Sequence, residues 1–273
     1  MSTDHVLKLY SKTIQSSFLH YGFWDDPENV ELSSLSLQDI KNAQYRYIDH
    51  LASFIPKKTK TILDVGCGIG GNTSFLLKKG YSLEALSPDS YQKSVIKEKF
   101  NQNVTFHHCK FEDFAPETVF DLILESESAC YIDINKGFKK AREVLREGGY
   151  VLASDYFVFY KDHSKSLHLK SSHDMNKYLK SAKENGFDLI KQYDQTDNTM
   201  LTLDYANYFI ERFISPTIDY GVYSTNKNFP KISKLIGLFV AKKWQEKQNQ
   251  LDLINSDLFR KYRKYMIYLF QKT

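Results

Sequence analysis

The sequence has few cysteines and no apolar run long enough to cross a bilayer. Its three cysteines, Cys67, Cys109 and Cys130, show no Cys-x-x-Cys spacing, so neither a disulfide framework nor a zinc site is indicated. The longest apolar stretches, such as residues 235–241, are far shorter than the ~20 residues of a membrane helix. The N-terminal residues lack the apolar segment of a secretory signal. We therefore expect a soluble protein in the reducing cytoplasm, with no integral membrane segment.

Charge of one sign is not concentrated anywhere in the chain. The 37 basic residues barely exceed the 33 acidic ones, for a net charge of +4, and the lysines are spread out. Because no base-reading module is recognisable and the net charge is small, a nucleic-acid partner is not expected. Aromatic residues are frequent, at 15%, which indicates either an aromatic-lined pocket or drift in composition.

Short apolar runs alternate with segments of helical spacing through most of the 273 residues. This alternation predicts an α/β fold, a doubly wound and mostly parallel seven-stranded sheet covered by helices on both faces. Helices are expected at 72–79, 90–100, 136–146 and 175–184. Strands are expected at 61–65, 82–86, 104–107, 120–124, 150–159, 187–192 and 265–270.

Two further segments flank this core. Residues 1–56 have helical texture that stops at Pro56, and we expect an N-terminal helical lid. Residues 57–195 then form the core, and 261–273 its last strand. The intervening residues 196–260 are too long for an ordinary connection and are mainly helical. We expect them to form a cap over the active site, with a second packing layer as the alternative.

A glycine-rich loop follows the first predicted strand. Gly66, Gly68 and Gly71 have the spacing G-x-G-x-x-G between a strand and a helix, where glycine lets the backbone turn sharply and approach a ligand. This spacing alone fits a dinucleotide site equally well. Such a site also needs an acidic residue about twenty positions later for the ribose, and the second strand ends instead at Ser87.

The acid that ends the first strand separates these alternatives. Asp64 followed by Gly-x-Gly-x-Gly resembles the first motif of class I S-adenosylmethionine-dependent methyltransferases. The resemblance implies S-adenosylmethionine as the cofactor. It also implies that Asp64, Gly66, Cys67, Gly68 and Gly70 form the loop that binds it.

Other segments are similar to a small-molecule branch of that family, the tocopherol, sterol and glycine-betaine type. Residues 20–25 (His-Tyr-Gly-Phe-Trp-Asp) resemble a segment whose aromatic residue folds over the cofactor. Residues 120–126 resemble the fourth-strand motif, and residues 145–150 resemble the turn before the fifth strand. The resemblance makes Tyr21 and Trp24 candidate cofactor walls, since aromatic faces stabilise a sulfonium. A hydrophobic anchor for the N-terminal segment is the alternative.

The chain departs from the family pattern at two places. No acid ends the second strand, so Ser87, Asp89 or Gln92 would have to hold the ribose hydroxyls. The usual Gly-Asp-Ala near the adenine reads Cys-Lys-Phe at residues 109–111, so the adenine contacts fall to Phe111 and Glu112.

Acidic residues beyond the fourth and fifth strands are the candidate catalytic groups. Glu125 and Glu127 are candidates for a base or a partner for a substrate ammonium, and Glu125 is preferred, as both a catalytic and a cofactor-contacting residue. Asp155 and Tyr21 are further catalytic candidates.

We therefore predict an enzyme that transfers a methyl group from S-adenosylmethionine to a small-molecule acceptor, lipid-like or an amine, by in-line displacement. Two alternatives are open, a nicotinamide-dependent oxidoreductase and a noncatalytic S-adenosylmethionine-binding protein. No metal site is expected, because the loop histidines His163, His168 and His173 are five residues apart. The sequence carries no signal for an oligomeric state.

Overall fold

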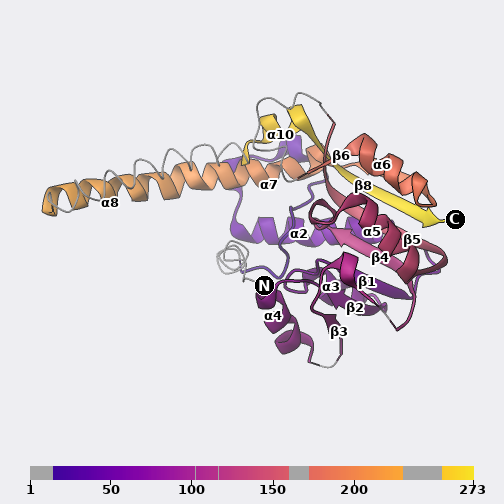
Figure 1. The fold of residues 1–273 in the computed structure, drawn as a ribbon. Helices are drawn as coiled ribbons and strands as arrows, with labels where there is room; N and C mark the ends of the chain where they lie inside the picture. The colour runs from indigo at the N-terminus through magenta and orange to yellow at the C-terminus, as the bar shows by residue number, and fades with distance from the viewer. Residues whose placement is uncertain (1–14, 102, 116, 160–171, 230–253) are drawn as a thin grey trace.

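The computed structural model is built around one twisted sheet with helices on both faces (Figure 1). It describes residues 15–101, 103–115, 117–159, 172–229 and 254–273. In these residues the sheet has eight strands, with the order β3-β2-β1-β4-β5-β8-β7 and β6 paired to β5. The strands are β1 (Thr61–Val65), β2 (Ser82–Leu86), β3 (Thr105–His107), β4 (Phe120–Ser126), β5 (Leu145–Val158), β6 (His173–Asp174), β7 (Phe187–Asp194) and β8 (Arg263–Lys272).

The seven predicted strands are confirmed, and the two-residue β6 is added to them. Strands β1 to β5 are parallel, while β8 is antiparallel to both β5 and β7. One boundary differs from the expectation. The helix expected to end near Gly148 stops at Val144, and β5 begins at Leu145. The glycines fall within β5, at a register shift against β4, where an extra segment can leave the ladder.

Helices cover both faces of the sheet because each strand alternates its side chains between two apolar clusters. The α2 and α3 helices pack on one face, and α5 and α6 pack on the other. The helices are α2 (Leu37–Ala52), α3 (Gly71–Lys78), α4 (Ser90–Phe100), α5 (Ile134–Val144), α6 (Met175–Glu184), α7 (Thr196–Phe209), α8 (Ser215–Asn228) and α10 (Ser256–Tyr262). No helix in the described ranges is long and apolar enough to cross a membrane.

The N-terminal segment differs from the predicted helical lid. Within the described part, only α2 is an α-helix, and residues 15–36 are irregular apart from short turns at Pro27–Asn29 and Leu32–Ser34. Their backbone groups bond to side chains of α2 instead of to one another. The Gln44 amide donates to the carbonyls of Phe18 and His20, and Arg46 Nε donates to the carbonyl of Phe23. This satisfies the backbone without a helix.

Residues 196–260, which were expected to form a cap over the site, are described at 196–229 and 254–260. The first half of α7 packs on the sheet through Met200 and Leu203. Beyond it a π-helical turn (Ile210–Ile214) leads into α8, which has no buried residue and projects away from the sheet (Figure 1). Trp244 and the rest of 230–253 lie outside the described residues, so the cap and its alternative, a second packing layer, stay predictions.

Candidate functional site

A cavity of about 670 Å³ lies at the carboxyl ends of β1, β2 and β4. This is the edge of an open parallel sheet where ligands bind, next to the point where the strand order reverses between β1 and β4. Its volume lies within the range typical of small-molecule sites, about 300 to 1,000 Å³. Residues 17–20 of the N-terminal segment lie along one side of it.

The glycine loop between β1 and α3 contributes the floor. Gly66, Gly68 and Gly70 have φ values of +73°, +56° and +76°, a region that side chains with a Cβ disfavour. A Cβ on Gly66 would overlap Ser128, and one on Gly68 would touch Leu19. Gly66, Cys67 and Gly68 line the cavity, whereas Gly70 faces the opposite way.

Gly70 was expected to contact the cofactor, and the structure gives it a different role. A Cβ there would strike Phe100 and Ile96 of α4. Gly70 therefore lets α3 and α4 pack closely behind the loop. It is the N-cap residue of α3.

Asp64 lies beneath this floor instead of facing the cavity. Its side chain is 1% exposed and accepts a hydrogen bond from Thr73 Oγ1 at 2.6 Å. Burial raises the pKa of this carboxyl to about 6, and the Thr73 hydrogen bond partly opposes the shift. Asp64 thus connects the end of β1 to the first turn of α3 and holds the loop from below. The resemblance implied that this acid helps to orient the loop, and its contact with the cofactor stays a prediction.

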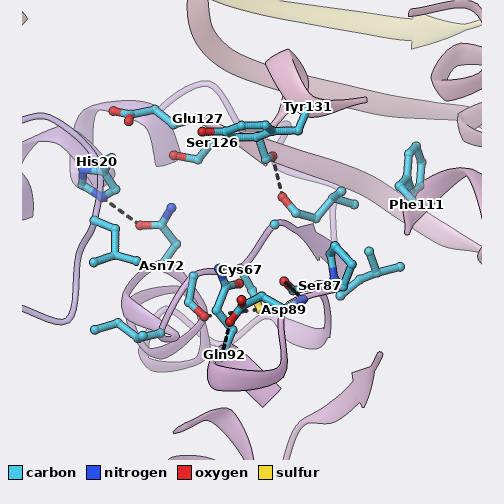
Figure 2. Close-up of a pocket in the computed structure, with 18 of the residues that line it drawn as sticks. His20, Cys67, Asn72, Ser87, Asp89, Gln92, Phe111, Ser126, Glu127 and Tyr131 are labelled. Atoms are coloured by element: carbon cyan, nitrogen blue, oxygen red, sulfur yellow. Dashed lines mark hydrogen bonds between the residues drawn. The ribbon is translucent and has the colours of Figure 1, made fainter. Parts of the chain in front are cut away.

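Three residues after β2 line the lower part of the cavity (Figure 2). Asp89 Oδ1 accepts from the backbone N–H of Gln92 at 2.8 Å and so caps α4, while Ser87 Oγ accepts from the N–H of Asp89 at 3.2 Å. Gln92 is 7% exposed, and its Oε1 has no hydrogen-bond partner. A buried acceptor without a partner is costly, so this oxygen is ready to accept from a ligand.

Phe111 and Glu112 line another wall, beside Lys110. They belong to the 3-10 turn Phe111–Asp113. Glu112 Oε1 accepts from the N–H of Asp133 at 3.0 Å, which holds the turn against the start of α5. The sequence had singled out both residues for the adenine, and the structure brings them to the same cavity as Ser87, Asp89 and Gln92.

Glu127 stands at the opposite end of the cavity, near Ser126 and Tyr131 (Figure 2). Its Oε1 accepts from the Tyr265 hydroxyl at 2.5 Å and from the Tyr21 N–H at 2.7 Å. Burial raises the pKa of its carboxyl to about 8, although these two hydrogen bonds lower it. Its φ is +53°, a left-handed conformation that is unfavourable for a glutamate. The fold holds this acid in a strained conformation at the cavity wall.

Glu125, the preferred sequence candidate, does not line this cavity. Two residues before Glu127, it points into the other face of the sheet, where its Oε2 accepts from the Tyr178 hydroxyl at 3.2 Å. Burial raises its pKa to about 7. Asp155 is likewise fully buried, and its carboxylate accepts from the N–H groups of Cys130 and Tyr156. Neither acid lines the cavity, and their contact with a ligand stays a prediction.

Tyr21 and Trp24 also lie outside the cavity lining. Trp24 is 4% exposed and packs with Ile40, Ala43 and Leu201. Its backbone N–H donates to the Asn198 carbonyl on α7, and its backbone carbonyl accepts from the Asn198 side-chain amide. Its packing against α7 favours the hydrophobic anchor over the cofactor wall, and its role toward the cofactor stays a prediction. Tyr21 contributes its backbone N–H to Glu127, and its ring lies 5.5 Å from that of Tyr265.

The structure adds cavity residues that the sequence did not single out as site residues. His20 lines the cavity, and its ring bonds to Asn72 at 3.0 Å (Figure 2). The ring also stacks on that of Tyr47, with the ring centroids 4.1 Å apart. Burial lowers the pKa of His20 to about 4, so the ring is neutral at pH 7. The motif at residues 20–25 pointed to this segment, but nothing in it distinguished His20 from its aromatic neighbours.

No cluster of three or more potential metal ligands occurs among the residues that the structure describes. His173 instead bonds through Nε2 to the carbonyls of Ala129 and Ile132, both at 2.8 Å. The other two loop histidines, His163 and His168, lie outside the described residues.

Residues 63–153 match a family model described as a methyltransferase domain. The probable chloroplastic tocopherol O-methyltransferase of Oryza sativa subsp. japonica is 28% identical over 140 residues, which cover 46% of this chain and 37% of that protein. The chloroplastic tocopherol O-methyltransferase of Arabidopsis thaliana is 28% identical over 168 residues, 54% of this chain and 47% of that protein. The chain thus spans less than half the length of these two relatives.

Solved structures share the fold over nearly the whole chain. A putative sarcosine dimethylglycine methyltransferase from Galdieria sulphuraria aligns with a TM-score of 0.72 and 18% identity, covering 99% of both chains. Geranyl diphosphate C-methyltransferase from Streptomyces coelicolor A3(2), solved with S-adenosyl-L-homocysteine, aligns with a TM-score of 0.68 and 14% identity, covering 97% of this chain and 93% of that one. Residues 63–153 thus match a methyltransferase domain, and the chain has the fold of these solved methyltransferases.

Proposed function

We propose that the chain binds S-adenosylmethionine in the 670 Å³ cavity and transfers its methyl group to a small-molecule acceptor that bears an O–H or N–H proton. The observation that carries the proposal is that one cavity has a glycine loop as its floor, an unpaired polar acceptor at one end and the half-buried Glu127 carboxylate at the other. The match to a methyltransferase domain supports the class of reaction.

The residues of the cavity fit the cofactor. Gly66 and Gly68 let the backbone come close to it, as they would for its methionine and ribose portions. Gln92 Oε1, buried and without a partner, is suited to accept from a ribose hydroxyl, with Asp89 beside it. Phe111 offers an apolar surface to the adenine. Cys67 adds a neutral wall, since burial raises the pKa of its thiol well above the usual range.

The sulfonium supplies an activated methyl group when it is bound. What the chain contributes is position, which is worth roughly 7 to 11 kcal/mol when reacting groups are held in line. Residues 17–20 cover the loop, since a Cβ on Gly71 would overlap the Ser17 carbonyl.

Glu127 takes the place of Glu125 as the proposed base. It is the acid that lines the cavity beside Ser126 and Tyr131, and a base must reach the proton that it removes. Ionised Glu127 would accept the proton of the acceptor as the new bond to carbon forms. With a pKa of about 8, it has the raised basicity that this transfer needs near neutral pH.

Binding is tested by titrating the protein with S-adenosylhomocysteine and, separately, with NADH. We expect saturable binding of the former and none of the latter. Tight NADH binding with no response to S-adenosylhomocysteine would instead support the oxidoreductase.

Catalysis is tested by transfer of labelled methyl from S-adenosylmethionine into a small-molecule extract. Glu127→Gln should lower the rate by about 10² to 10⁴-fold. Glu125→Gln is the matched control, a buried carboxyl two residues away that does not line the cavity, and it should retain transfer. Equal transfer by Glu127→Gln and the wild type would refute the assignment. Absence of transfer in every form, despite binding, would favour a noncatalytic S-adenosylmethionine-binding protein.

The cellular compartment stays a prediction. Cys67, Cys109 and Cys130 are all free thiols, which agrees with a reducing compartment such as the cytoplasm.

A further inference from the structure

Glu127 is the end of a hydrogen-bond chain that leads from the cavity into the core. The Tyr265 hydroxyl contacts Glu127 Oε1 at 2.5 Å and lies 3.0 Å from the Tyr47 hydroxyl. Tyr47 in turn lies 2.6 Å from Ser154 Oγ, and Gln195 Nε2 donates to Ser154 Oγ at 2.9 Å. The chain therefore has four consecutive hydrogen bonds, from Gln195 to Glu127.

The chemistry of its two ends limits which groups donate. An amide nitrogen can only donate, and an ionised carboxylate can only accept. Ser154 therefore accepts from Gln195 and can give its own proton to Tyr47. The Tyr265 hydroxyl is the donor in both of its contacts, so its single proton is shared between Tyr47 and Glu127, and the contact with Glu127 is the shorter one.

The members of the chain come from four separate elements. Tyr47 lies on α2, Ser154 on β5, Tyr265 on β8, and Gln195 directly before α7. All four residues are 0% exposed. Tyr47 also lies 3.4 Å from Ser126 Oγ, a second residue of the cavity wall. A buried polar group needs a partner, and here the partners join the cavity wall to the packing of the whole sheet.

We propose that Tyr265 and Tyr47 are positioning residues: Tyr265 donates to Glu127, holds it at the cavity wall and stabilises its ionised form, and Tyr47 holds the Tyr265 hydroxyl in place. The inference rests on the proposed role of Glu127 as the base. It goes beyond that role by assigning the control of the base to two tyrosines that do not line the cavity.

Other groups also influence the Glu127 charge. Three elements place a group near its carboxyl: the N-terminal segment with the Tyr21 N–H, β5 with Asp155, and β8 with Tyr265. The Asp155 charge raises the pKa of Glu127, whereas the two hydrogen bonds lower it. The remaining ionisable groups that interact with the Glu127 charge are Tyr47, Cys130 and Tyr156.

The test is a ¹³C NMR titration of protein labelled at the glutamate side-chain carboxyl, with the Glu127 resonance assigned by its loss in Glu127→Gln. Tyr265→Phe removes the donated proton and keeps the ring. Since a hydrogen bond to a charged group contributes about 1.5 to 3 kcal/mol, the pKa of Glu127 should rise by about one to two units.

Tyr268→Phe is the matched control. Tyr268 lies three residues along the same strand, is also 0% exposed, and packs into the cluster on the opposite face of the sheet. Its hydroxyl has no hydrogen-bond partner. The control should leave the Glu127 titration unchanged. An unchanged Glu127 pKa in Tyr265→Phe, or an equal shift in both variants, would overturn the proposal.

Tyr47→Phe gives a second test if Tyr265→Phe does not fold. It removes the second acceptor of the Tyr265 proton, so the proton goes to Glu127 alone and the Glu127 pKa should fall, opposite in sign to the shift in Tyr265→Phe. An unchanged Glu127 pKa in this variant would count against the positioning role of Tyr47. Methyl transfer is then followed against pH in each variant that folds. Because the base must be ionised, the rise in rate should move along the pH axis together with the Glu127 pKa.

The two readouts separate the two proposals. A shifted Glu127 pKa without methyl transfer in any form would contradict the proposed function and leave the positioning role intact. A wild-type rate that depends on Glu127, together with an unshifted pKa in Tyr265→Phe, would contradict the positioning role alone.

Discussion

Replacing Gly66 by alanine tests whether the glycine loop comes as close to its surroundings as the cavity requires. Gly66 has a φ of +73°, and a Cβ there would overlap the Cβ of Ser128. Ser128 would have to move, although its hydroxyl donates to the Val65 carbonyl at 2.6 Å. The left-handed conformation costs about 1 to 2 kcal/mol for alanine, and the overlap adds about 1 to 3 kcal/mol.

Gly80→Ala separates these two contributions. Gly80 also has a positive φ, +93°, but a Cβ there would meet nothing within 4 Å. It should therefore lose only the conformational part, about 1 to 2 kcal/mol. Each kcal/mol lowers the melting temperature of a chain of this size by roughly 2 to 4 °C.

Thermal unfolding and calorimetric titration with S-adenosylhomocysteine provide the assays. Gly66→Ala should be less stable than Gly80→Ala and should bind the ligand at least about tenfold more weakly, a loss of about 1.4 kcal/mol. Gly80→Ala should bind like the wild type. If Gly66→Ala keeps wild-type affinity, or if both variants are destabilised equally, the close approach at Gly66 does not shape the site.

Three further predictions follow from the burial or exposure of individual side chains. Because the folded-state pKa values of Glu125 and Glu127 are raised to about 7 and about 8, the native protein binds more protons than the unfolded chain, so stability should fall by roughly 3 kcal/mol between pH 6.5 and 8.5. Urea unfolding across that range measures this, and a rising stability would contradict it. Trp24→Phe should lower the melting temperature while leaving the affinity for S-adenosylhomocysteine unchanged, since Trp24 packs against α7 outside the cavity; weakened binding by the folded variant would restore Trp24 to the site. Serine in place of Phe213, in the π-helical turn, or of Tyr223, on α8, should change stability by less than about 0.5 kcal/mol, since these side chains are 54% and 59% exposed. A loss of 2 kcal/mol or more in chemical denaturation would mean that this segment packs against another part of the protein.

The alternation of short apolar runs with helical spacing was sufficient to predict the sheet. Each run is flanked by glycine or polar residues, and each is too short for a helix, so the strands at 61–65 and 120–124 could be located from local pattern alone. The glycine loop was predictable for the same reason. Its conformation depends on glycine at particular positions, whatever the rest of the fold does.

Side-chain direction was not predictable in this way. Glu125 and Glu127 are both acids at the end of one strand, and a period of two would place them on the same face. The left-handed backbone at Glu127 interrupts that period, so that Glu127 reaches the cavity while Glu125 meets Tyr178 behind the sheet. Which acid faces the ligand was decided by the turn after β4.

By itself, the sequence determined the order of strands and helices, the glycine loop and the absence of an acid at the end of β2, because these depend on residues close together in the chain. Only the tertiary structure decided which loop residue touches the cavity, where Trp24 packs, and which partners Glu127 has. Those partners, Tyr21 and Tyr265, are 106 and 138 residues away from it. Contacts over such separations arise from packing on the completed sheet, and no local pattern encodes them.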